Sequence, residues 1–173
     1  MSDYLDYKVV AFILLLTVSL LAIVFDIVPV LVVATLSALA SVQNAAKQKN
    51  IQIKKEMGEN ISGIKADADK TTWVLNNFLT NAIRYSADNA EIIISIQQQD
   101  NKVQFSVKDF GKGIDPQYKD KIFDRYFKIP GTKEGTGLGL AICKEFIEAQ
   151  QGTIWMESIV DKGTRFGFEL PVV

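Results

Sequence analysis

The chain has 173 residues, with 19 basic and 20 acidic side chains and a formal net charge of −1. This length suits one domain with an appendage, and the balance argues against a nucleic-acid-binding domain, which carries a strongly basic surface. The chain has no histidine and one cysteine. A histidine general base, a histidine metal ligand, a phosphorylated histidine and an internal disulfide are therefore excluded within this chain.

Residues 9–42 form an almost continuous apolar stretch, interrupted by Asp26 and Pro29. A bilayer core about 30 Å thick takes about 20 helical residues, so this stretch is too long for one upright span. It predicts two short membrane spans, over residues 9–25 and 28–42. A buried helical hairpin of a soluble protein is the alternative interpretation.

Four lysines between residues 47 and 55 follow the apolar stretch. Because cytoplasmic flanks of membrane spans are rich in basic residues, the remainder of the chain is expected in the cytoplasm. The predicted organisation is a transmembrane hairpin in residues 1–44 and a soluble domain in residues 45–173, at the inner membrane.

Beyond residue 50, short alternating segments and amphipathic segments follow one another. In chain order the predicted elements are a strand at 51–55, a helix from Asp67 or Asp69 to about Tyr85, strands at 90–97 and 103–108, a partly helical segment at 117–127, a helix at 138–150, and strands at 153–158 and 164–170. This order predicts an α/β fold, a two-layer sandwich in which a mixed sheet has helices on one face.

The first of these helices is unusual because it carries Asn76, Asn77 and Asn81 among apolar residues. Asparagine is a poor helix former, since its amide competes for nearby backbone groups. Asn77 and Asn81 are four residues apart and share one helix face, and Arg84 follows three residues later. Solvent-facing helix residues are the plain interpretation, and a polar site on that face is the functional one.

Four stretches occur in order: NNFLTNAIRY (76–85), DFGKGID (109–115), IFDRYFK (122–128) and GTGLGL (135–140). Together they resemble the N, G1, F and G2 boxes of the ATP-binding domain of sensor histidine kinases. That family belongs to the GHKL superfamily with gyrase, Hsp90 and the mismatch-repair ATPases. The resemblance implies the GHKL fold, ATP and Mg²⁺ as cofactors, and transfer of the γ-phosphoryl group to a histidine.

By this resemblance, the side-chain oxygen of Asn81 coordinates Mg²⁺, which prefers oxygen ligands. Arg84 meets phosphate oxygens, and Tyr85 flanks the nucleotide. Asn77 stands where the gyrase branch has a glutamate that activates water. An amide has no useful basicity, so the site is expected to hold ATP without rapid hydrolysis.

The resemblance also assigns the adenine end of the site. Asp109 accepts a hydrogen bond from the adenine amino group, and Thr164 lies nearby. Gly111 and Gly113 let the backbone turn and approach the base without a Cβ clash. The plain alternative for Asp109 is a side chain that caps a turn.

The GTGLGL stretch precedes a helix, where backbone N–H groups can face phosphates at the positive helix end. A plain flexible loop is the alternative. Lys128 lies where the family has a basic residue near the phosphates, and residues 129–136 resemble the nucleotide lid. The residues assigned to the nucleotide from the G2 box are Gly135, Thr136, Gly137, Leu138 and Gly139.

Three residues near these boxes have structural interpretations. Phe123 and Phe127 are expected to share an apolar helical face and pack at the base of the lid. Gln150 stands where the family often has histidine, and a structural role is expected there.

The chain departs from complete sensor kinases, which carry a dimerising helical hairpin with the phosphoacceptor histidine before the ATP domain. In the full-length family the partners are that domain and a response regulator. Residues 2–40 resemble the start of the transmembrane region of potassium-responsive Kdp-type sensor kinases, so a large internal deletion joined near Ser41 is expected.

This chain could supply Mg-ATP but not the acceptor. One alternative function is a truncated, catalytically silent nucleotide-binding regulatory module. Another is a serine kinase of the anti-sigma-factor type, which is usually soluble.

Overall fold

The computed structural model describes residues 30–59, 61–64, 66–132 and 135–172. Its strands are β1 (Gln52–Met57), β2 (Glu91–Gln99), β3 (Lys102–Asp109), β4 (Thr153–Ile159) and β5 (Gly163–Pro171). They form one sheet in the order β1-β2-β3-β5-β4. β1 is parallel to β2, whereas the β2–β3, β3–β5 and β4–β5 pairs are antiparallel.

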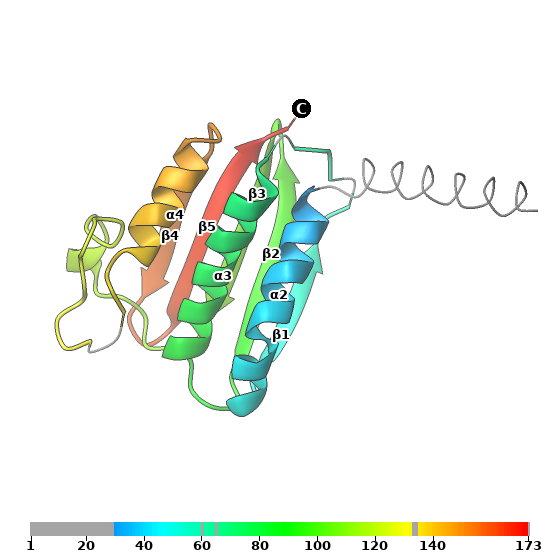
Figure 1. The fold of residues 1–173 in the computed structure, drawn as a ribbon. Coiled ribbons are helices and arrows are strands. Elements are labelled where there is room, and N and C mark those ends of the chain that lie inside the picture. Colours follow the sequence, from blue (N-terminus) through cyan, green and yellow to red (C-terminus); the bar gives the residue numbers. More distant parts are fainter. Residues whose placement is uncertain (1–29, 60, 65, 133–134, 173) are drawn as a thin grey trace, which may run out of the picture.

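The α-helices α2 (Val30–Gln48), α3 (Ala68–Tyr85) and α4 (Gly139–Glu148) lie on one face of this sheet (Figure 1). Helix α3 lies between α2 and α4. This arrangement confirms the predicted two-layer α/β sandwich with a mixed sheet and helices on one face.

Helix α3 begins where the sequence predicted. Asp67 is the N-cap, and its Oδ1 accepts a hydrogen bond from the Lys70 backbone N–H at 3.0 Å. The Lys70 ammonium group lies 2.7 Å from Oδ2 of the same carboxylate. The apolar residues of the helix face the sheet and are buried: Val74, Leu75, Phe78, Leu79, Ala82 and Ile83.

Aromatic packing fixes α3 on the centre of the sheet. The Phe78 ring stacks on Phe166 with a centroid distance of 5.4 Å, and Phe105 stacks on Phe168 at 4.7 Å. Phe78 also lies 6.2 Å from Phe168. Because β3 and β5 carry these rings, the ends of both strands have a fixed position relative to α3.

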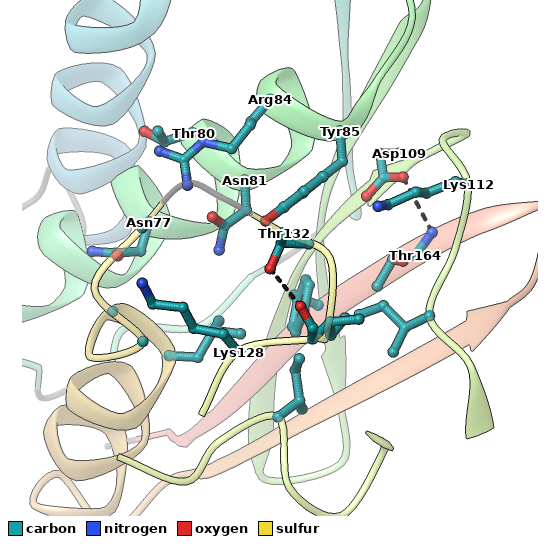
Figure 2. Close-up of a pocket in the computed structure, with 18 of the residues that line it drawn as sticks. Asn77, Thr80, Asn81, Arg84, Tyr85, Asp109, Lys112, Lys128, Thr132 and Thr164 are labelled. Atoms are coloured by element: carbon teal, nitrogen blue, oxygen red, sulfur yellow. Dashed lines mark hydrogen bonds between the residues drawn. The ribbon is translucent and has the colours of Figure 1, made fainter. Parts of the chain in front are cut away.

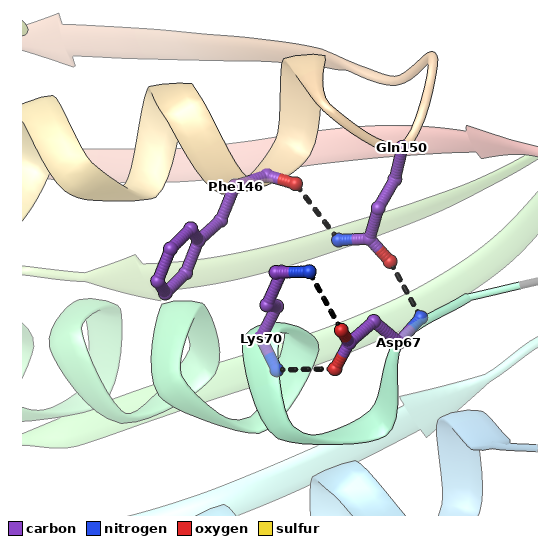
Figure 3. Close-up of polar contacts among 4 residues, drawn as sticks. All are labelled: Asp67, Lys70, Phe146 and Gln150. Carbon is purple, nitrogen blue, oxygen red and sulfur yellow. Dashed lines mark hydrogen bonds and ion pairs between the residues drawn. The ribbon is translucent and has the colours of Figure 1, made fainter.

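Gln150 connects the N-terminal end of α3 to the C-terminal end of α4 (Figure 3). Its Oε1 accepts a hydrogen bond from the Asp67 backbone N–H at 2.7 Å, and its Nε2 donates to the Phe146 carbonyl at 2.9 Å. Phe146 in turn makes an edge-on contact with Trp73, at 5.4 Å between centroids. These contacts are structural, as expected for Gln150.

Helix α2 differs from the expectation for the apolar stretch. Residues 30–42, expected in a second membrane span, lie in a helix that packs along α3. The buried residues recur every four positions, at Ala34, Ala38, Val42 and Ala46. This strip of small residues allows close packing of α2 against α3. Helix α2 ends at Gln48, so it continues past residue 44, where the sequence predicted a domain boundary.

No helix in the described ranges is long and apolar enough to cross a lipid bilayer. The first predicted span, residues 9–25, and most of the segment that resembles Kdp-type kinases lie outside the described residues.

The segment at 117–127 is also less helical than predicted. A 3-10 helix covers Pro116–Tyr118, and turns follow. Tyr126 has φ 63°, which an α-helix cannot contain, and its N–H donates to the Gly137 carbonyl at 2.8 Å. Phe123 and Phe127 therefore share no helical face, although Phe123 does pack edge-on against Phe166 in the core.

Candidate functional site

A cavity of about 430 Å³ lies between the C-terminal half of α3, the start of α4 and the loops that follow β3 and residue 127 (Figure 2). Its volume is within the usual range for small-molecule sites. The sequence assigned a ligand or metal role to twelve of its lining residues: Asn77, Asn81, Arg84, Tyr85, Asp109, Gly113, Lys128, Gly135, Thr136, Gly137, Gly139 and Thr164.

Two assigned residues, Gly111 and Leu138, do not line the cavity but support its walls. A Cβ at Gly111 would collide with the Tyr85 carbonyl oxygen. Leu138 is the N-cap residue of α4, and its N–H donates to Thr136 Oγ1 at 3.3 Å.

Asp109 ends β3 and is 5% exposed. Its Oδ1 accepts hydrogen bonds from the backbone N–H groups of Gly111 at 2.9 Å and Thr164 at 3.3 Å. Burial raises the pKa of this carboxyl above its ordinary value, and these two hydrogen bonds oppose the rise. Both bonds end on Oδ1, so Oδ2 is the oxygen with capacity for a ligand donor.

A hydroxyl network holds Thr164 beside Asp109. Ser158 Oγ donates to the Gly163 carbonyl at 2.9 Å and accepts from the Ile114 N–H at 2.8 Å. It also lies 2.9 Å from Thr164 Oγ1. Since the single Ser158 proton goes to Gly163, Thr164 is the donor in this pair. The Thr164 hydroxyl therefore presents its lone pairs as acceptors.

Glycine is required at two turns in this region. Gly113 has φ 68°, and a Cβ there would collide with the Ile159 carbonyl. Gly137 has φ 73°, and a Cβ there would come within 2.7 Å of the Tyr126 carbonyl carbon. Any other residue would open the two loops that border the cavity.

The Asn77 side chain of α3 lies at the cavity wall, next to the start of α4. Its Nδ2 donates to the Trp73 carbonyl at 3.0 Å. A Cβ at Gly139 would come within 2.5 Å of its Oδ1, so glycine lets α4 start against this side chain. Asn81, one turn further along α3, lines the same cavity (Figure 2). The shared face predicted for these residues is therefore present.

The start of α4 and the segment before it form the opposite end of the cavity. The N-cap residue Leu138 offers no side-chain acceptor to the first N–H groups of α4. Lys128, Gly135 and Thr136 line this end and are exposed. Such a helix start attracts anions, because unpaired N–H groups and the helix dipole act together.

Residues 66–173 match the family model described as histidine kinase-, DNA gyrase B- and HSP90-like ATPase. The chain belongs to this ATPase family. Its membership agrees with the resemblance that the four boxes carry, and with the observed sandwich.

Curated relatives place this ATPase domain among the histidine kinases. The chain is similar to the adaptive-response sensory kinase SasA of Gloeothece citriformis, at 36% identity over 129 residues, which are 73% of this chain and 33% of that protein. It is also 36% identical over 131 residues to the sensor histidine kinase WalK of Bacillus subtilis, covering 72% of this chain and 21% of WalK. The chain thus spans a third or less of these relatives.

Solved structures of histidine kinases have the same fold as this ATPase domain. The catalytic domain of ThkA is 32% identical, with TM-score 0.69 over 78% of this chain and 87% of that one. Full-length ShkA in complex with AMPPNP is 27% identical, with TM-score 0.71 over 80% and 29% of the two chains. ThkA in complex with the response regulator TrrA is 26% identical, with TM-score 0.70 over 100% and 53%.

Sequence reasoning missed several residues that line the cavity of this ATPase domain. Lys112 was overlooked although it lies within DFGKGID, and its Nζ is 5.4 Å from the centre of the Tyr85 ring. Thr80 precedes Asn81 directly. The apolar lining residues could not be predicted from the sequence, because the wall of a binding site and the core of a protein are built from the same apolar residue types. Ile129 and Thr132 belong to the segment that the sequence assigned to the lid, and both line the cavity. The other missed residues are Asn76, Ile114, Ile122, Leu140 and Phe166.

Proposed function

We propose that this chain is the ATP-binding catalytic module of a two-component sensor histidine kinase, which binds Mg-ATP and presents it to a histidine on another domain or protein. The observation that carries the proposal is the cavity itself. It brings together residues from all four boxes, which are separated in the sequence by up to about 60 positions.

The end of the cavity at Asp109 and Thr164 suits adenine. A carboxylate oxygen that is not used by backbone donors can accept a hydrogen bond from the adenine amino group. The Thr164 hydroxyl offers a second polar contact beside it. Both side chains are buried, so water competes little for their polar atoms.

The other end suits a triphosphate. Arg84, Lys128 and the start of α4 line it, and guanidinium, ammonium and helix N–H groups all favour phosphate oxygens. The Asn81 amide oxygen fits a Mg²⁺ ion, which takes few protein ligands and several waters and phosphates. A bound Mg²⁺ would neutralise charge on the phosphates during phosphoryl transfer.

The chain's own residues favour retention of ATP over its hydrolysis. Asn77 cannot act as a general base, and its amide is held in contacts with Trp73 and Gly139. Since these 173 residues include no histidine, the acceptor histidine would lie on another domain or protein. The solved complexes of ShkA with AMPPNP and of ThkA with TrrA support a nucleotide ligand and a response-regulator partner.

Calorimetric titration of the chain with ATP, with and without Mg²⁺, tests this proposal. We expect saturable binding at one site that weakens when Mg²⁺ is removed. A folded sample that shows no heat of binding in either buffer would contradict an ATP-binding function.

The absence of histidine from the sequence favours a second candidate, a catalytically silent module that binds nucleotide and regulates a partner. Labelled ATP and a histidine-bearing dimerisation domain from a related kinase distinguish the two. Acid-labile label on the added domain supports the kinase module, whereas binding without transfer supports the regulatory module.

Attachment to the inner membrane through residues 9–25, with the ATP-binding domain in the cytoplasm, stays a prediction from the apolar stretch. Fractionation of expressing cells tests it. We expect the chain in the alkali-resistant membrane fraction, and recovery in the soluble fraction would contradict it.

A further inference from the structure

Lys49 lies in the turn between α2 and β1, and its side chain reaches the C-terminal end of α3. The ammonium group donates to the carbonyl oxygens of Ile83 at 2.9 Å, Arg84 at 3.2 Å and Ser86 at 3.0 Å. The last carbonyls of a helix lack intrahelical donors and carry partial negative charge. Lys49 therefore supplies three donors and a positive charge where α3 ends.

The turn that carries Lys49 is itself held against the loop after α3. The Asn89 N–H donates to the Lys49 carbonyl at 2.8 Å, and Asn50 Nδ2 donates to Asn89 Oδ1 at 2.7 Å. The Ile51 N–H closes the end of α2 on the Ala46 carbonyl at 2.9 Å. Lys49 is therefore anchored at its backbone as well as at its ammonium group.

The opposite side of the same helical turn faces the loop that follows β3. The Tyr85 carbonyl lies so close to Gly111 that a Cβ there would collide with it. The Gly111 N–H donates to Asp109 Oδ1 at 2.9 Å. The last turn of α3 is thus held between Lys49 and the loop that carries Asp109.

We propose that Lys49 is a positioning residue for the nucleotide cavity. It does not line the cavity and belongs to none of the four boxes. It holds the backbone of Arg84 and Tyr85 and so fixes their side chains relative to Asp109. The inference rests on the proposed ATP-binding function. It assigns part of the affinity to a contact between the turn after α2 and the C-terminal end of α3.

The test compares Lys49→Met with Lys47→Met in the full chain. Lys47 is an exposed lysine two residues earlier, for which the structure shows no hydrogen bond to α3. We expect Lys49→Met to raise the Kd for Mg-ATP roughly tenfold at a temperature where the variant is folded. Lys47→Met should keep the wild-type Kd, and Lys49→Arg should restore most of the affinity, because guanidinium also donates to carbonyls.

Hydrogen exchange in the nucleotide-free chain gives a second reading. Amides at residues 84–86 should exchange faster in Lys49→Met than in Lys47→Met. A Lys49→Met variant with wild-type Kd contradicts the proposal, even if its Tm falls, because lower stability alone indicates a purely structural role. If the wild-type chain binds no ATP, the proposed function fails, and unchanged exchange at residues 84–86 would then also overturn the role of Lys49.

Discussion

Asp109 and Thr164, at one end of the cavity, are 5% and 6% exposed and belong to adjacent strands of the sheet. At the other end, Lys128, Gly135 and Thr136 are exposed, and none of the three belongs to a helix or strand. Stacked aromatic rings on β3 and β5 hold the strands that carry Asp109 and Thr164. Near the exposed end, turn contacts such as the hydrogen bond from the Tyr126 N–H to the Gly137 carbonyl hold the chain.

This difference indicates two modes of binding within one site. The sheet holds the groups around Asp109 in place, so these groups would lose little conformational entropy when a ligand binds. At the other end, Lys128, Gly135 and Thr136 are exposed and lie outside helices and strands, so fewer packed groups fix their positions.

The largest expected effect is that of Asp109→Asn. The amide keeps an acceptor for the Gly111 and Thr164 N–H groups but replaces the carboxylate that would bind adenine. We expect the Kd for Mg-ATP to rise roughly 10- to 100-fold, since hydrogen bonds to charged groups are strong. Calorimetry measures this change, and an unaltered Kd would remove Asp109 from base recognition.

Asp109→Asn also tests how the buried carboxylate affects the stability of the fold. Because burial raises the Asp109 pKa in the folded chain, the folded state binds more protons than the unfolded state between the ordinary and the raised pKa. The contribution of Asp109 to stability therefore falls as the pH rises through that window. Asp109→Asn should remove this dependence and leave Tm at neutral pH equal or higher. A marked fall in Tm would show that the carboxylate stabilises the fold.

The next effect concerns Asn81→Ala, which removes the proposed oxygen ligand of Mg²⁺. We expect roughly tenfold weaker binding of ATP in the presence of Mg²⁺ and little change in its absence. Asn101→Ala, an exposed substitution in the β2–β3 turn, is the matched control. Equal losses with and without Mg²⁺ would show that Asn81 serves the nucleotide or the fold instead of the metal.

The smallest effect is expected for Lys128→Met at the exposed end. Its charge is screened by solvent, so the Kd for Mg-ATP should rise only about threefold at low salt and less at high salt. Lys121→Met, an exposed lysine of the same loop, should change nothing. A loss that does not depend on salt, or one larger than that of Asp109→Asn, would reverse the comparison between the two ends.

The fold was predictable where local signals and long-range packing agree. Asp67 has the residue type and spacing of an N-cap, and the apolar period after it marks the buried face of α3. The β2–β3 and β4–β5 hairpins turn at Asp100 and Asp161, which adopt positive φ values of 53° and 59°. The four boxes located most of the cavity, because residue types with a specific chemistry recur at fixed spacing.

Other features depend on contacts that no local pattern contains. Hydropathy alone does not distinguish a membrane span from a helix that packs within a domain. The packing of residues 30–42 along α3 is therefore not visible in their composition. The four-residue spacing of Ala34, Ala38, Val42 and Ala46 is the sequence signal that agrees with this packing. Tyr126 breaks an apparent helical pattern with a positive φ. Lys49 contacts carbonyls 34 to 37 positions away, and nothing in its own neighbourhood points to them.

Hydrogen exchange of the wild-type chain with and without Mg-ATP tests the central claim most directly. We predict that Mg-ATP protects the stretches that line the cavity, which are residues 77–85, 109–114, 128–132 and 135–137. Protection confined to other regions, such as the uncovered face of the sheet, or no protection at saturating Mg-ATP, would contradict nucleotide binding in this cavity.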